Sequence, residues 1–214
     1  MNQHKPASLS EQVFSKIESD ILSGVYKRGD ILTEIGLSNS LGVSRTPVRE
    51  ALRMLEKEDL IEESSRGIVV IGITNEDIED IFNIRLKIES DAAYLAAKNM
   101  SEEEIKELYE RLELHEFYAM KKDADRMKEV DSEFHNILYR GSGSITYYNI
   151  LKLLHKKAQS YRKASVSNED RAKISALEHR EIYEAIADRN PEKARAAAEK
   201  HVKNAAYKIL KGDK

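Results

Sequence analysis

The 214-residue sequence contains no cysteine, which excludes disulfides, thiolate metal sites and cysteine nucleophiles. It also lacks any apolar stretch approaching the length needed to span a bilayer, so we expect no membrane partner. The segment from Met1 to Pro6 lacks the apolar core of a signal peptide, which predicts a cytoplasmic protein. Only three prolines occur, and none interrupts the long helical patterns of the second half.

An excess of basic charge is missing too. The formal net charge is −3, and residues 1–74 hold nine Lys and Arg against eleven Asp and Glu. Proteins that bind nucleic acid usually show a basic patch. Any such patch in this part of the chain is therefore confined to a few side chains: Arg45, Arg49, Arg53, Lys57 and Arg66.

The most informative segment is Gly42 to Leu52, GVSRTPVREAL, which predicts a tight turn followed by a helix. Ser44 is a suitable N-cap, because its hydroxyl can accept a bond from an amide of the first turn. Arg45 and Arg49 are four residues apart and project side by side. A neighbouring apolar stripe can hold the helix against a core: Val48, Leu52 and Leu55. An anchored helix with paired arginines suits the major groove of DNA, where arginine binds guanine.

The flanking patterns complete a winged helix-turn-helix. Apolar residues recur every four positions from Leu9 to Ile21, which predicts a first helix, and Thr33 can cap a short second one. After the arginine helix, the apolar runs 60–61 and 68–71 flank a polar loop that ends in Gly67, which is typical of a β-hairpin. Residues 1–73 are thus predicted to form a DNA-binding domain of three helices and a hairpin. Arg66 lies at the wing tip, near the DNA backbone or minor groove.

Residues 74–214 are predicted to form an all-helical bundle of about six helices, so the chain as a whole is mainly α. Helix starts are indicated by small polar residues that can cap a first turn: Thr74, Ser101, Asp123, Ser144 and Asn190. Pro191 fits the first helical position after Asn190. The polar segment 165–171 predicts a loop, followed by a helix over about 173–189.

Four residues of this bundle form a candidate metal site. Asp131 and His135 are four apart on one helix face, and His179 and His201 follow on two later helices. One carboxylate and three imidazoles suit a divalent transition metal, zinc first, with nickel and manganese as alternatives. Four protein ligands leave room for water or an incoming carboxylate. The remaining histidines we interpret as surface or packed residues: His4, His115 and His155.

Residues 9–71 resemble the winged-helix domain of the GntR family of bacterial transcription regulators. The matching segments include Arg28-Gly29, the run Leu41 to Leu52 and Arg66-Gly67. The resemblance implies that operator DNA is contacted by four residues, Ser44, Arg45, Thr46 and Arg49. It also implies that the wing glycine, Gly67, approaches the DNA closely. Ile35 stands where many relatives carry a further DNA-contacting arginine, which argues against that contact here.

Residues 75–211 resemble the FCD effector domain of the FadR subgroup of that family, through the runs Asp131 to His135 and Glu178 to Ile182, and through His201. The resemblance implies that an ion is coordinated by Asp131, His135, His179 and His201, and that Arg85 is associated with the carboxylate of a small effector. We therefore expect a ligand-responsive regulator rather than an enzyme. It would act as a homodimer on a pseudo-palindromic operator in double-stranded DNA, commonly as a repressor.

Other interpretations stay open. The ion can have a purely structural role, and Arg85 can pair with Glu89 as an ordinary surface pair. The chain can also be a metal-dependent hydrolase with an accessory winged helix, although Glu133 and Glu178 are expected to point away from the ligands. In a third class, the winged helix is only a protein-interaction module, for which the paired arginines have no evident use.

Overall fold

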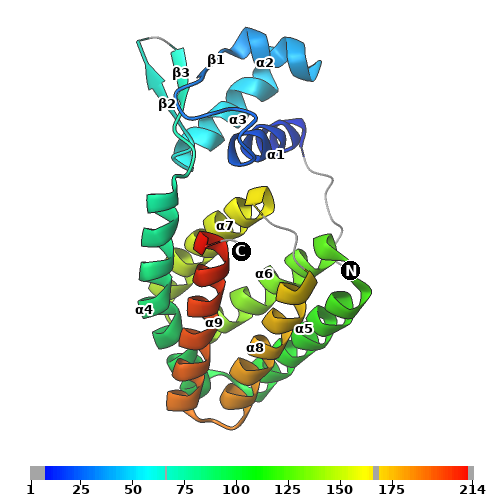
Figure 1. Ribbon diagram of the computed structural model, residues 1–214, viewed down its shortest axis with the longest axis vertical. Coiled ribbons are helices and arrows are strands. Elements are labelled where there is room, and N and C mark those ends of the chain that lie inside the picture. The colour runs from blue at the N-terminus through cyan, green and yellow to red at the C-terminus, as the bar shows by residue number, and fades with distance from the viewer. Residues whose placement is uncertain (1–7, 66, 166–168, 212–214) are drawn as a thin grey trace. The chain divides into compact units, whose positions relative to one another are not determined.

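The computed structural model describes residues 8–65, 67–165 and 169–211. The chain divides into two compact units, with the boundary between Thr74 and Asn75. Figure 1 shows the helices and strands of both units. Among the described residues, none of the helices combines the length and the apolar character that crossing a bilayer requires.

The first unit is a winged helix-turn-helix, as the sequence predicts (Figure 1). Its helices are α1 (Leu9–Leu22), α2 (Glu34–Leu41) and α3 (Arg45–Lys57), and its strands are β1 (Ile31–Leu32), β2 (Ile61–Ser64) and β3 (Gly67–Val70). β2 and β3 form the antiparallel hairpin, with Ile61 opposite Val70 and Ser64 opposite Gly67. β1 joins the other edge of β3. The sequence pattern missed β1 because a strand of two residues has no detectable alternation.

The apolar stripe of α3 lies in the core of this unit. Val48 and Leu55 are fully buried, and Leu52 is nearly so. They pack in one cluster with Val13, Ile17 and Ile21 of α1. Burial of this face holds α3 with its opposite face outward, which decides which of its side chains a ligand can reach.

In the part of the chain that the structure describes, the second unit is a bundle of six helices, which confirms the predicted all-α architecture (Figure 1). The helices are α4 (Asn75–Asn99), α5 (Glu102–Lys121), α6 (Ala124–Gly141), α7 (Ile145–Ser165), α8 (Glu169–Ala187) and α9 (Pro191–Lys211). α4 packs along α9, while α5 packs against α6 and α8. The order of the helices in the chain thus differs from their order in space, and residues far apart in the sequence meet inside the bundle.

The core of the bundle combines large and small side chains. Phe134, Leu138 and Ile186 fill its middle, each at most 1% exposed. Small side chains let α4 and α9 approach closely: Ala92, Ala93 and Ala96 on α4, with Ala194 and Ala198 on α9. The same core also encloses a set of polar side chains, which no apolar packing argument explains.

The predicted helix starts of the bundle are largely confirmed. Ser101 and Glu104 form a reciprocal capping box, and the Asp123 carboxylate accepts a bond from the Arg126 amide. Asn190 caps α9 by accepting from the Lys193 amide. The start of α8 differs, since it begins at Glu169 rather than near Lys173. The predicted loop 165–171 falls partly outside the described residues, because 166–168 are not described.

Candidate nucleic-acid interface and candidate metal centre

The N-terminal end of α3 presents its polar side chains outward. Ser44, Arg45, Thr46 and Arg49 are all exposed, with side-chain exposures of 58% for Arg45 and 52% for Arg49. The structure therefore brings the four residues of the predicted interface to one end of one helix. Arg66, the predicted wing-tip residue, lies outside the described residues.

Ser44 occupies the N-cap position of α3, but the expected capping bond does not form. Within the described part of the chain, its side chain accepts no bond from the first turn. The physical reason lies three residues on, where Pro47 has no backbone N–H to donate. The Ser44 hydroxyl thus stays available at the exposed end of the helix.

Gly67 stands at the start of β3 with φ +118°, in a region that side chains rarely adopt. A Cβ at this position would lie 3.1 Å from Cγ2 of Ile31. Both observations require glycine for the fold of the wing. They explain the residue without reference to DNA, so its predicted contact with the operator stays a prediction.

Glu34, on the first turn of α2, binds both Arg45 and Arg49. Its carboxylate accepts from Arg45 Nη2 at 2.7 Å and from Arg49 Nε at 2.8 Å. The hydrogen bonds from Arg49 and then Arg45 lower the pKa of Glu34 to about 2. Glu34 is not predictable from the sequence pattern, since its pairing with the two arginines depends on how α2 packs against α3. An acidic residue directly after the Thr33 cap was the available indication.

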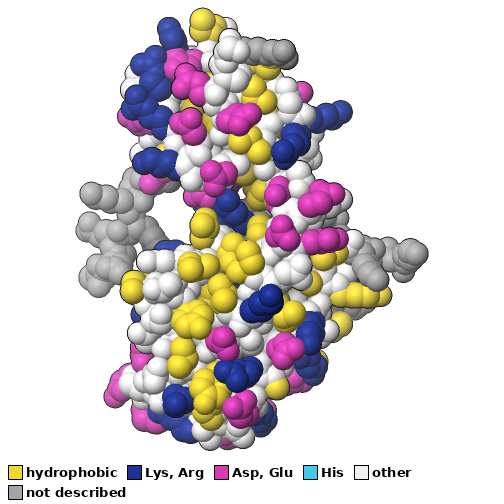
Figure 2. Space-filling model, turned by 90° about the vertical axis from the view of Figure 1, so that its left-hand side faces the viewer, with side chains coloured by type: hydrophobic (Ala, Val, Ile, Leu, Met, Phe, Trp, Pro, Cys, Tyr) yellow, Lys and Arg dark blue, Asp and Glu magenta, His cyan; other side chains and the backbone are white. Residues whose placement is uncertain are grey.

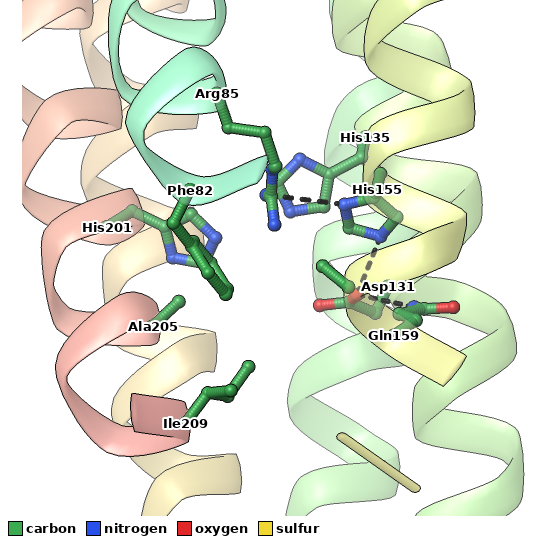
Figure 3. A pocket seen from close by; sticks show the side chains of 10 residues that line it. Phe82, Arg85, Asp131, His135, His155, Gln159, His201, Ala205 and Ile209 are labelled. Carbon is green, nitrogen blue, oxygen red and sulfur yellow. Dashed lines mark hydrogen bonds and ion pairs between the residues drawn. The ribbon is translucent and has the colours of Figure 1, made fainter. Parts of the chain in front are cut away.

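The four predicted metal ligands lie together inside the bundle, and Figure 3 shows three of them. Asp131 and His135 come from α6, His179 from α8 and His201 from α9, and each is at most 6% exposed. His179 Nε2 lies 3.7 Å from Asp131 Oδ1. One ring nitrogen from each of the three histidines lies within 4.8 Å of the others.

Two further histidines, His115 and His155, belong to this cluster. Their interpretation as ordinary surface or packed residues missed that both lie beside Asp131. His155, on α7, has its Nε2 3.2 Å from Asp131 Oδ2, and His115, on α5, has its Nε2 3.8 Å from Asp131 Oδ1. Both are buried. Sequence spacing gave no link between them and Asp131. Each nevertheless lies on the apolar face of its own helix, since His115 comes three residues after buried Leu112 and His155 four residues after buried Leu151.

The electrostatics favour the protonation states that a metal ion requires. Burial lowers the pKa of His179 well below its ordinary value, and it lowers that of His155 to about 4. Burial alone would raise the pKa of Asp131, but the hydrogen bond with His155 and the neighbouring His135 bring it well below its ordinary value. Neutral imidazoles and an ionised carboxylate are the forms that ligate metals.

Several ring nitrogens of the cluster lack a hydrogen-bond partner among the described residues. They include Nε2 of His135 and both ring nitrogens of His179, which is fully buried. Buried polar atoms are nearly always paired in folded proteins, so these atoms indicate a missing partner. Because they belong to a set of imidazoles beside a carboxylate, the residues fit a divalent transition metal.

Glu178 supports one of these ligands, contrary to the expectation that it points away. It is buried, and its Oε2 lies 2.8 Å from Nδ1 of His201. Such an outer carboxylate fixes the orientation of a histidine and leaves the other nitrogen, Nε2, for an ion. The expectation failed because Glu178 meets α9 through the packing of α8. Glu133 is half exposed, with its carboxylate near Arg111.

Arg85 is buried in the bundle rather than part of a surface pair. Its guanidinium lies 2.9 Å from the Glu89 carboxylate, and both side chains are at most 4% exposed. Glu89 also lies 3.1 Å from Nδ1 of His135. The charge of Arg85 is therefore already matched, and Glu89 links it to the histidine cluster.

A small pocket opens beside the cluster (Figure 3). Polar residues line one part of it: Arg85, Asp131, His135, His155, Gln159 and His201. Apolar residues line the remainder: Phe82, Ala158, Ala205 and Ile209. Gln159 donates from Nε2 to Asp131 Oδ2 at 2.8 Å. A small molecule in this pocket would meet both the histidine cluster and an apolar wall.

Comparisons with known proteins agree with this arrangement. Residues 9–71 match the family model described as bacterial regulatory proteins, gntR family, and residues 80–204 match the FCD domain. The chain is 30% identical over 201 residues to the uncharacterized HTH-type transcriptional regulator YdhC of Bacillus subtilis, covering 92% of this chain and 88% of that protein. It is 33% identical to the gluconate operon transcriptional repressor of Bacillus licheniformis, over 69% of this chain and 59% of the repressor.

Among solved structures, E. coli McbR/YncC has the same fold. The TM-score is 0.73 at 22% identity, and the match covers 96% of this chain and 98% of the other.

Proposed function

The chain belongs to the GntR family of bacterial regulatory proteins and carries an FCD domain, and from this premise we propose a DNA-binding repressor controlled by a small organic acid at a divalent-metal site. The related proteins are transcriptional regulators, and the chain is a regulator rather than an enzyme. The observation that carries the proposal is the pair of exposed arginines on α3, combined with buried histidines beside a pocket in the FCD unit.

Operator recognition is assigned to the exposed end of α3. Arg45 and Arg49 contact bases or phosphates, and Ser44 and Thr46 contact the backbone. Arg66 and Gly67 of the wing approach the adjacent groove. Glu34 holds the two guanidinium groups side by side in the DNA-free protein.

A gel shift tests this assignment on DNA from upstream of the protein's own gene. We expect Arg49→Ala to weaken binding by about 5- to 150-fold, since a bidentate arginine–guanine contact contributes about 1–3 kcal/mol. Arg126→Ala serves as the matched control, because Arg126 is an equally exposed arginine of the FCD unit, paired with Glu129. Equal binding by wild type and Arg49→Ala would refute the assignment.

Control by an acid is assigned to the FCD unit. We propose that Asp131, His135, His179 and His201 hold zinc, or alternatively nickel or manganese, and that a bound ion supplies a positive centre for a carboxylate. The small pocket beside these residues combines polar groups with an apolar wall, so an acid that widens it would meet partners for both its carboxylate and its carbon atoms. One relative is named for the gluconate operon, which supports a small carboxylate as the effector class.

Arg85 contributes to this site through Glu89 rather than as an unmatched cation. Its ion pair with Glu89 leaves the bound ion as the main positive charge for an acid. Binding of the acid would change operator affinity by shifting the equilibrium between two arrangements of the paired DNA-binding units. This requires the acid to bind one arrangement more tightly than the other. We place the regulator in the cytoplasm, with the chromosome.

A homodimer follows from the same proposal, since two α3 helices read the halves of a pseudo-palindromic operator. Figure 2 shows hydrophobic side chains gathered on one face of the FCD unit. Exposed apolar residues of α4 and α7 include Ile84 at 46%, Ile150 at 44% and Leu153 at 45%. Sedimentation of the Leu153→Asp variant tests whether such residues form the interface, because a buried charge there would produce monomers.

A further inference from the structure

We propose that the histidine cluster binds two divalent ions, bridged by the carboxylate of Asp131. The inference rests on the proposed metal site: it adds His115 and His155 to the four proposed ligands and divides the enlarged set between two ions, with His179 on one and His135 on the other. In this arrangement, one ion lies deep in the bundle and the other faces the pocket.

The two oxygens of Asp131 face different histidines. Oδ1 lies 3.7 Å from Nε2 of His179 and 3.8 Å from Nε2 of His115. Oδ2 lies 3.2 Å from Nε2 of His155. His135 completes the second group, since its ligand atom lies within 4.8 Å of those of Asp131 and His155. These two groups of three share Asp131 and have no histidine in common, and a third group of close ligand atoms, His135, His179 and His201, connects them.

These separations suit atoms that ligate a common ion. Zinc bonds of about 2.0–2.2 Å in a tetrahedral arrangement place neighbouring ligand atoms roughly 3.3–3.6 Å apart. The distances of 3.2–3.8 Å at Asp131 lie close to that range. A carboxylate oxygen has two lone-pair sites, so Oδ2 can accept from Gln159 and also bind an ion.

All five buried histidines receive a place in this scheme. Each contributes one nitrogen to one ion, so Asp131 is the one ligand that the two ions share. His201 completes either group, because its ring centre lies 4.7 Å from that of His179 and 5.2 Å from that of His135. A single ion on the four predicted ligands leaves His115 and His155 outside the ligand set, although both face Asp131.

The two ions would have different access. Among the described residues that line the pocket are Asp131, His135 and His155, whereas His115 and His179 are not among them. The ion between His135 and His155 is therefore the one an acid reaches, and the other is enclosed. This division assigns a structural role to one ion and an effector-binding role to the other.

The charge of the cluster supports an anionic ligand at the accessible ion. The buried carboxylates are Asp131, Glu89 and Glu178, and Arg85 opposes them. Two divalent cations exceed the negative charge that these groups supply. A bound carboxylate or hydroxide would reduce the surplus, and a carboxylate is well suited to bridging two ions about 3.5–4 Å apart.

Metal stoichiometry tests the proposal directly. The full chain is loaded with zinc chloride, desalted and analysed by elemental mass spectrometry and native mass spectrometry. We expect two zinc ions per chain for wild type, and one each for His115→Gln and His155→Gln. His4→Gln, the matched histidine control, retains two. One ion in wild type, unchanged in both variants, would overturn the inference and leave the proposed function intact. Failure to bind any ion would also remove the metal from that function.

A second measurement does not depend on the variants folding. Manganese chloride replaces zinc in the wild-type protein, and electron paramagnetic resonance distinguishes an exchange-coupled pair from isolated ions. We expect the coupled spectrum at two equivalents of manganese. A spectrum of isolated ions at every loading would contradict a shared Asp131 bridge.

Discussion

Removal of the metal from the FCD unit is expected to lower the melting temperature of the protein markedly. Without an ion, Nε2 of His135 and both ring nitrogens of His179 are buried with no hydrogen-bond partner among the described residues. An unsatisfied buried polar atom costs about 1–3 kcal/mol. Binding of an ion to even one or two of these nitrogens would therefore raise the free energy of unfolding substantially. Zinc at 100 times its dissociation constant adds about 2.7 kcal/mol to the free energy of unfolding.

That free energy corresponds to a shift of roughly 5–11 °C, at about 2–4 °C per kcal/mol for a chain of this size. Differential scanning calorimetry with zinc and with a chelator measures the shift. The His179→Gln variant should lose most of it, because His179 is fully buried at the centre of the ligand set and stacks on Phe134. His4→Gln should keep it. A zinc-dependent shift of equal size in wild type and His179→Gln would refute the reasoning.

Three further predictions concern single features of the two units. Because Ser44 forms no capping bond within the described chain while Thr33 accepts from the Gly36 amide, Ser44→Ala should change the free energy of unfolding by under about 0.5 kcal/mol. Thr33→Ala should lower it by about 0.5–2 kcal/mol, and urea titration compares the two. Glu34→Gln releases the recognition arginines, so binding to random DNA should strengthen and its salt dependence should steepen; fluorescence anisotropy at several salt concentrations would show no change if the pairing were irrelevant. The metal-free protein should lose stability between pH 6.5 and 4, because burial lowers the pKa of His155 to about 4 while an unfolded histidine titrates near 6.5. The unfolded chain then binds more protons in that range, and a pH-independent urea midpoint would contradict this.

Much of the fold is predictable from the sequence because its helix starts are local. The bonds at Ser101 and Asp123 involve residues within one turn, and the spacing of side chains shows them. The failure at Ser44 was local as well. Pro47, three residues on, removes the amide that the cap would bind, so the sequence contained the reason and the cap pattern alone overlooked it.

The candidate site is predictable only in part, because its members meet through tertiary packing. The four predicted ligands do lie together, as the resemblance to the FCD domain implied. His115 and His155 have no sequence spacing that links them to Asp131, and they reach it through the packing of α5 and α7 around α6. Glu34 and Glu178 likewise find their partners across helix–helix contacts. A histidine on the apolar face of a helix was the one usable indication.

The most direct test of the account combines both units in one measurement. Binding of the full chain to DNA from upstream of its own gene is followed by anisotropy, in the metal-loaded and metal-free states, with and without a series of small carboxylic acids such as gluconate. We predict that at least one acid changes operator affinity by about 5-fold or more, and that the effect disappears when the metal is removed or when His135 is replaced by Gln. Operator affinity that responds to an acid equally well in the metal-free protein and in that variant would contradict it.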